Sequence, residues 1–244
     1  MKVEGVILCD ASMWCCTFFG CDSVEVDNVK IVGQWRYNSD GIDVVNSSRV
    51  RVRNCFVRSF DDALVVKGLT QNSGEPETVF IGDQPVEDVT FERCVVWCDW
   101  GRGMCIGAET FAPSISNVVF RDIDVIRTTD VFMDILHGNK AAVSDITFEN
   151  IRAGIDDHTP EPVFQTEKGQ VYADPNRGYV PRLMSISIAP NGWLPDGTLG
   201  TVDRVTYKNV TVYGSKRPAS DFTGNSAVHR IDGVEIDNLV IGGT

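Results

Sequence analysis

Short stretches of alternating apolar and polar residues recur along the whole chain, and one six-residue pattern accounts for most of them. The pattern runs apolar, any, apolar, any, usually Asn, apolar, as in residues 24–29 (VEVDNV). Further copies begin at residues 50, 89, 118, 146, 205 and 234, and a partial copy begins at Met1. Alternation with period two is typical of strands that bury one face, and no helical period competes with it. Each copy is therefore predicted to form a strand.

The spacing of these copies predicts a solenoid. Their fifth positions fall at residues 5, 28, 54, 93, 122, 150, 209 and 238. Most of the steps lie in the range of about 20–50 residues that is typical of solenoid repeats, and the two longest steps are expected to hold loop insertions. These insertions are residues 70–85 and 154–181, which are punctuated by Pro and Gly. Asn suits a turn at the fifth position because it tolerates left-handed backbone.

A second short apolar segment follows most copies and predicts a second strand in each turn. These segments are residues 41–45, 63–66, 103–106, 132–135 and 183–186. Two or more short strands per turn without helices indicate a β-solenoid rather than a propeller or a leucine-rich repeat. We therefore predict an all-β, right-handed parallel β-helix of about seven to eight rungs, stacked about 4.8 Å apart, as a single domain over residues 1–244. Because the chain begins inside a rung and shows no polar cap, we expect N-terminal rungs and a cap to be missing.

Composition and charge argue against several classes of binding partner. The chain has 244 residues, of which 43% are apolar, and a formal net charge of −12. This charge argues against nucleic acid and, more mildly, against a polyanionic glycan. No apolar run of about eighteen residues occurs, so no membrane-spanning helix is expected. The first residues do not resemble a signal peptide, so we expect either a cytoplasmic protein or a secretion signal outside this chain.

The eight cysteines lie between Cys9 and Cys105. They lack the Cys-x-x-Cys spacing or added His ligands that zinc requires, so no metal site is predicted. Cys55 and Cys94 occupy the last, apolar position of two copies of the repeat. We therefore predict buried free thiols rather than disulfides or metal ligands.

Carboxylates gather at the start of the second strand in two adjacent turns. When residue Ile42 is aligned with Leu64, Asp40 stands beside Asp62 one turn away, and Asp61 lies at the turn itself. Carboxylates about 4.8 Å apart raise one another's pKa, and a pair with separated pKa values is what glycoside hydrolysis requires. Asp before Gly, and Asp-Asp, are also ordinary turn residues.

The same alignment places Arg102 in the column of Asp40 and Asp62. Three small residues occupy the adjoining column, and we expect them to leave room for a sugar ring; they are Gly41, Ala63 and Gly103.

The segments Asn38-Ser39-Asp40-Gly41, Asp61-Asp62 and Gly101-Arg102-Gly103 together resemble glycoside hydrolase family 28. That family includes polygalacturonases and rhamnogalacturonases and carries the motifs Asn-Thr-Asp, Asp-Asp, Gly-His-Gly and Arg-Ile-Lys. The resemblance runs from about residue 3 to at least residue 151. It implies a pectin-lyase-like β-helix, hydrolysis of glycosidic bonds with inversion, and no cofactor. It also implies that Asp61 is the general acid and that Asp40 and Asp62 activate the water.

The departures from the family pattern bear on the substrate. Arg102 replaces the family's His, and Phe132-Met133-Asp134 stands where the family has Arg-Ile-Lys. Asp134 is expected to repel a uronate, so we predict a neutral or differently decorated glycan rather than polygalacturonate. Phe132 is predicted either to stack on a sugar or to pack on a neighbour. Carboxylates in one column are spaced more like those of retaining enzymes, although Asp61, displaced along the chain, opens a wider gap.

Further polar residues are predicted to border the site and contact the substrate. With Phe132 and Asp134, the candidates are Asn38, Lys67, Arg102, Glu109 and His137. His158 and His229 are not expected to take part in catalysis. Two alternatives stay open. One is a Ca²⁺-dependent polysaccharide lyase built on the same carboxylates and Arg102, and the other is a glycan-binding solenoid without turnover.

Overall fold

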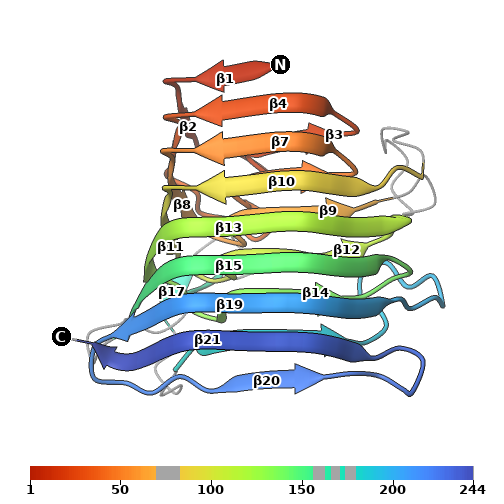
Figure 1. Cartoon of the computed structure of the whole chain (residues 1–244). Coiled ribbons are helices and arrows are strands. Elements are labelled where there is room, and N and C mark those ends of the chain that lie inside the picture. Colours follow the sequence, from red (N-terminus) through yellow and green to blue (C-terminus); the bar gives the residue numbers. More distant parts are fainter. Residues whose placement is uncertain (70–82, 156–162, 166–170, 174–179, 244) are drawn as a thin grey trace.

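The computed structural model describes residues 1–69, 83–155, 163–165, 171–173 and 180–243, and strands dominate this part of the chain (Figure 1). The strands are β1 (Lys2–Glu4), β2 (Ile7–Cys9), β3 (Cys16–Phe19), β4 (Asp22–Asp27), β5 (Lys30–Val32), β6 (Ile42–Val45), β7 (Ser48–Arg53), β8 (Phe56–Ser59), β9 (Leu64–Gly68), β10 (Val86–Glu92), β11 (Val95–Cys98), β12 (Met104–Thr110), β13 (Ser114–Arg127), β14 (Val131–His137), β15 (Ala142–Gly154), β16 (Val163–Gln165), β17 (Val171–Ala173), β18 (Arg182–Ile188), β19 (Thr201–Tyr213), β20 (Ser220–Thr223) and β21 (Ile231–Gly243). Within the described ranges there is no helix of the length and apolarity needed to cross a membrane.

Two parallel sheets carry nearly all of these strands. One contains twelve described strands, and the other contains seven in the order β20-β18-β14-β12-β9-β6-β3. The chain visits both sheets in each turn, so β4, β5 and β6 pair with β7, β8 and β9 of the next turn. Figure 1 shows successive turns stacked from β1 to β21. The predicted all-β parallel β-helix is confirmed.

The repeat keeps its turn geometry throughout. All eight fifth positions have left-handed backbone, with φ between 52° at Arg93 and 66° at Gly5. Asn side chains continue as a ladder between turns, since the Asn209 amide donates to Asn150 Oδ1 at 3.0 Å. A second left-handed position lies five residues before most of these, for example at Arg204 and Asn117. The sequence did not predict this second position because its residue type changes from turn to turn.

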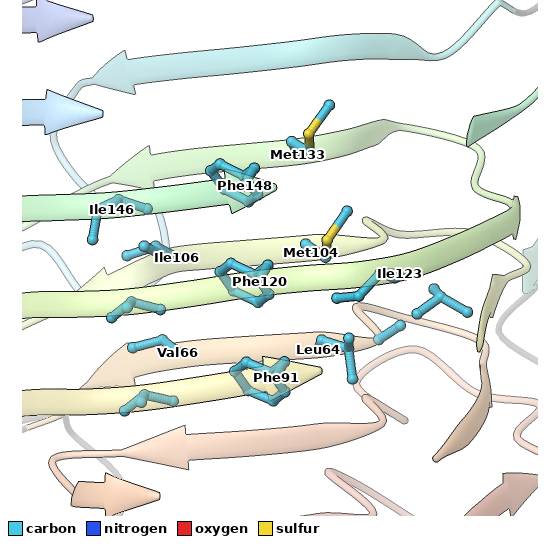
Figure 2. Close-up of a cluster of buried hydrophobic side chains, with 14 of the residues drawn as sticks. Leu64, Val66, Phe91, Met104, Ile106, Phe120, Ile123, Met133, Ile146 and Phe148 are labelled. Carbon is cyan, nitrogen blue, oxygen red and sulfur yellow. The ribbon is translucent and has the colours of Figure 1, made fainter. Parts of the chain in front are cut away.

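Aromatic rings form one continuous inner column. Phe91, Phe120, Phe148 and Tyr207 stack in nearly parallel planes, with centroids 5.0 or 5.1 Å apart. Figure 2 shows the first three rings one above another. This spacing follows from the distance between neighbouring strands of a sheet. The repeated apolar positions therefore build the core.

All eight cysteines are free, as predicted. Cys55 and Cys94 are buried in the inner column that the repeat indicates, but Cys9 is exposed and Cys15 and Cys21 are only partly buried, so the prediction of burial fails at these three. Of the two predicted insertions, residues 70–82 lie outside the described residues. The second insertion is described only in part and includes the antiparallel strands β16 and β17.

Candidate active site

The seven-stranded sheet brings the predicted residues together at the entrance of three neighbouring strands. Ile42 pairs with Leu64, and Leu64 pairs with Met104, as the sequence alignment predicts. Asp40, Asp62 and Arg102 precede these paired residues by two positions. Backbone hydrogen bonds continue the register into the turns, because Gly41 N–H donates to Asp62 O at 2.8 Å and Ala63 N–H donates to Arg102 O at 2.9 Å. The three side chains therefore belong to successive turns of one column.

Asp61 lies at the turn before β9, and backbone amides hold its carboxyl group. Asn38 N–H donates to Oδ2 at 2.9 Å, and Asp62 N–H donates to Oδ1 at 3.0 Å. Asn38 can supply this bond because its backbone is left-handed, with φ of 60°. Asp61 is 9% exposed. Burial raises the pKa of Asp61 to about 7, and the nearby Asp62 and Asp40 carboxylates add to the rise. The group can therefore hold a proton near neutral pH.

Asp62 has a different environment because it lies against a cation. Arg102 donates its backbone N–H to Oδ1 at 2.8 Å, and its guanidinium Nη1 lies 3.3 Å from both carboxylate oxygens. The same guanidinium binds Asp134 through Nε at 2.7 Å and lies 3.6 Å from Asp130. One cation thus connects three carboxylates.

The carboxyl groups of Asp61 and Asp62 both lie close to the backbone of Gly101. A Cβ at residue 101 would lie 2.7 Å from Asp62 Oδ1 and 2.8 Å from Asp61 Oδ1. No side chain fits there without displacing these carboxyl groups. The first Gly of the Gly-Arg-Gly motif is therefore required by the packing of the two carboxyl groups.

Asp40 lies beside Lys67 rather than beside Arg102. Lys67 Nζ lies 3.1 Å from Asp40 Oδ2, 3.4 Å from Glu109 Oε2 and 3.9 Å from Asp43 Oδ1. The Trp14 ring covers the same ammonium group, with its centroid 4.0 Å from Nζ. Burial raises the pKa of Asp40, and Lys67 acts in the opposite direction. Lys67 is 5% exposed and already pairs with these carboxylates, so its predicted contact with substrate stays a prediction.

Phe132 and His137 do not face the site. Phe132 is fully buried in the hydrophobic core, so of the two predicted roles only packing on neighbours is possible. His137 is also fully buried, and its Nδ1 lies 2.8 Å from Thr110 Oγ1. Burial lowers the pKa of His137 to about 4, so the ring is neutral at pH 7. Neither side chain has surface for a sugar, and both predictions of substrate contact are corrected.

The small residues beside the carboxylates face the interior. A Cβ at Gly41 would lie 2.3 Å from Ala63 O and 2.4 Å from Val57 Cγ1, and one at Gly103 would lie 3.0 Å from Phe132 O. The expected room for a sugar ring is therefore not at this column. Its small residues instead permit close backbone packing inside the solenoid.

Asp134 is also covered. It is 2% exposed and bound to Arg102, and burial raises its pKa to about 6. Its charge is therefore partly balanced before any substrate is present.

The sequence interpretation missed Asp43, which follows the Asn-Ser-Asp-Gly motif. Asp43 is fully buried, and neither carboxylate oxygen has a hydrogen-bond partner among the described residues. Burial raises the pKa of Asp43 to about 7. Its position one residue past Ile42, on the outward side of β6, was the available signal. Among the described residues, no cluster of three or more His, Cys, Asp or Glu side chains is arranged to hold a metal ion.

Comparisons with known proteins relate this chain to enzymes that act on carbohydrates. The family model for Glycosyl hydrolases family 28 matches residues 1–168. Rhamnogalacturonase A from Aspergillus aculeatus is 26% identical over 149 residues, which are 61% of this chain and 30% of that protein. The polygalacturonase of Juniperus ashei is 26% identical over 156 residues, which are 62% of this chain and 27% of that protein. The chain thus spans less than a third of the length of these relatives.

A solved structure resembles the whole chain. The exopolygalacturonase from Thermotoga maritima superposes with a TM-score of 0.55 at 17% identity, over 100% of this chain and 52% of that one. At this identity the likeness supports the fold alone.

Proposed function

This chain belongs to Glycosyl hydrolases family 28, and from that membership and the geometry of Asp40, Asp61 and Asp62 we propose that it hydrolyses O-glycosidic bonds of a polysaccharide or oligosaccharide. The proposed mechanism is a single displacement by acid and base catalysis. The observation that carries it is the unequal environment of two adjacent carboxyl groups. Asp62 lies against the Arg102 guanidinium, whereas Asp61 is buried beside two other carboxyl groups and makes no ion pair among the described residues.

This inequality supports a division of labour. Asp61, whose pKa burial raises to about 7, donates its proton to the leaving glycosidic oxygen. Asp62 and Asp40 accept the proton of the water that attacks the anomeric carbon. The family resemblance favours inversion, although the convergence of Asp61 and Asp62 on Gly101 is closer to the short separation of retaining enzymes. The anomeric form of the first product, observed by NMR, tests this part of the proposal.

The charge of the site supports a neutral sugar at the point of cleavage. Arg102 is shared by Asp62, Asp130 and Asp134, and Lys67 is buried among carboxylates. Neither cation is left to pair with a uronate there. Rhamnogalacturonan, which contains neutral rhamnose beside galacturonate, suits this charge better than polygalacturonate does. The names of several relatives point to the same polymer.

A substrate panel tests the proposal. New reducing ends are measured with rhamnogalacturonan, polygalacturonate and neutral oligosaccharides, with Asp61→Asn as the inactive reference. We expect hydrolysis of rhamnogalacturonan or a neutral glycan that persists in excess chelator, without an unsaturated product that absorbs in the near ultraviolet. Activity that needs Ca²⁺ and forms such a product would favour the lyase alternative. Binding without turnover on any glycan would favour the non-catalytic one, and polygalacturonate as the best substrate would overturn the substrate proposal.

A further inference from the structure

Lys67 is the centre of a buried group of charges, of which the proposed mechanism uses only Asp40 directly. The side chains of Lys67 and Asp40 are 6% and 3% exposed, and that of Glu109 is 13% exposed. Asp43, which completes the group, is fully buried. An ionised carboxylate removed from water is strongly unfavourable unless a partner compensates it. One ammonium group cannot balance three ionised carboxylates, so the protons must be distributed unequally.

The distances from Lys67 Nζ show which carboxyl group pairs with it most closely. The contact with Asp40 is the shortest at 3.1 Å, and Asp43 is the most distant at 3.9 Å. Asp43 is also fully buried, which disfavours its ionised form further. The geometry therefore makes Asp40 the first partner of Lys67, with Asp43 competing for the same ammonium group.

We propose that Lys67 is a positioning residue whose buried ammonium group holds the Asp40 carboxylate in place and sets the pH at which Asp40 ionises. Lys67 acts through Asp40 and does not contact the substrate, because the Trp14 ring covers it at 4.0 Å. Asp43 acts in the opposite sense, since its own charge opposes the ionisation of Asp40. The low-pH limit of catalysis would then depend on two residues outside the three aspartates.

Several groups lie against Asp40 or against its partners Lys67 and Asp43, so all of them bear on its ionisation. They are Trp14 and Cys15 from the segment before β3, Asp43 from β6, Asp61, Asp62 and Lys67 from β9 and the turn before it, and Glu109 from β12. Among these groups Lys67 supplies the positive charge. The cation of the neighbouring cluster, Arg102, contacts Asp62, Asp130 and Asp134 instead. A substitution of Lys67 should therefore change the ionisation of Asp40 more than that of Asp62.

This inference rests on the proposed function for its catalytic consequence, but its physical content can be measured without substrate. The ionisation of Asp40 is followed by ¹³C-carboxyl NMR in the full chain, with the signal assigned by its loss in Asp40→Asn. In parallel, kcat/KM is measured against pH on whichever glycan the unmodified protein cleaves. If no glycan is cleaved, the proposed function fails while the NMR titration still decides the role of Lys67.

Replacement of the Lys67 ammonium group by a neutral group should shift the pH at which Asp40 ionises upward. Lys67→Met should raise the ionisation midpoint of Asp40 by about one to three pH units, because an adjacent opposite charge is lost. The acidic limb of kcat/KM should shift upward by a similar amount. Lys67→Arg, which restores a positive charge, should return both midpoints toward those of the unmodified protein. Lys208→Met removes a lysine from an exposed pair with Glu149 and should change neither midpoint.

A second variant keeps the test decisive if Lys67→Met does not fold. Asp43→Asn retains Lys67 and removes one competing carboxyl group, so the Asp40 midpoint should fall. The double variant Lys67→Met with Asp43→Asn should lie between the two single variants. An Asp40 midpoint that does not move in Asp43→Asn, or in a folded Lys67→Met, would overturn the proposal.

Discussion

Two columns of side chains in the solenoid follow different rules. The inner column repeats its chemistry, with Phe91, Phe120 and Phe148 stacked at 5.0 Å. The column before the seven-stranded sheet does not keep one residue type, since Asp40 and Asp62 occupy two turns and Arg102 the next. A ring gains contacts from an identical neighbour, whereas a carboxylate is repelled by one. Repetition in this fold therefore stabilises the core, and the break in repetition marks the place of the proposed chemistry.

The three neighbouring carboxylates are tolerated because a different partner stabilises each of them. Asp62 has Arg102, Asp40 has Lys67, and Asp61 has two backbone amides. Removal of a carboxylate from this column should thus impair the proposed reaction more than the fold. Removal of a ring from the inner column should do the opposite.

The largest expected effect is on hydrolysis when the catalytic carboxylates are neutralised one at a time. Asp61→Asn, Asp40→Asn and Asp62→Asn should each lower kcat by about 10²- to 10⁴-fold, because proton transfer in the transition state is lost. Circular dichroism should show each variant folded. Asp237→Asn makes the same change at an exposed position and should retain full activity. Near-normal turnover in all three variants would refute the catalytic assignment.

The converse prediction concerns stability and is tested in the inner column of stacked rings. Phe120→Ala should lower the free energy of unfolding by about 3–5 kcal/mol, because a fully buried aromatic side chain leaves a cavity. Chemical denaturation measures this loss, and activity per folded molecule should be unchanged. Phe222, at the end of the stack, is 39% exposed, so Phe222→Ala should destabilise much less. An equal loss for both variants would contradict the view that the stack works as a buried column.

Much of the fold could be predicted from the sequence because the repeat records it directly. The fifth position of each copy marks a left-handed turn even where Arg93 replaces Asn. The alignment of Ile42 with Leu64 also placed Asp40, Asp62 and Arg102 in one column. These features depend on register alone, which a period of two residues fixes.

The environment of each side chain could not be predicted in the same way. Lys67 and Asp134 look like exposed ion-forming residues in the sequence, yet they are 5% and 2% exposed. Phe132 looks like a sugar-stacking ring but lies in the core, because the column it shares with Gly103 faces inward. Burial and pairing depend on several turns at once, and a pattern within one turn does not contain them.

A smaller effect is expected on substrate choice. Asp134→Asn removes one of three carboxylates that share Arg102, so the guanidinium should attract an acidic sugar more strongly. We expect the rate on polygalacturonate relative to a neutral glycan to rise about 5- to 10-fold, which corresponds to about 1 kcal/mol. The gain should be greatest at low salt, where screening is weak. Asp221→Asn, at the Arg182 ion pair farther along the same sheet, is the matched control. No change in the relative rates would show that Arg102 does not determine substrate charge.

The smallest expected effect separates backbone conformation from side-chain bonding in the repeat itself. Asn209 has φ of 53°, donates to Asn150 at 3.0 Å and accepts from Asn238 at 2.8 Å. Both Asn209→Gly and Asn209→Ala lose the side-chain bonds, but Gly also removes the Cβ from left-handed backbone, whereas Ala keeps it there without the polar group that helps Asn to tolerate this conformation. Because that conformation costs an L-residue about 1–2 kcal/mol, the Gly variant should unfold at higher denaturant concentration than the Ala variant. At Thr211, within strand β19, the order should reverse, since Gly weakens a strand interior. If the Ala variant unfolded at a higher denaturant concentration than the Gly variant at both positions, the Asn ladder, and not the left-handed turn, would explain why Asn recurs.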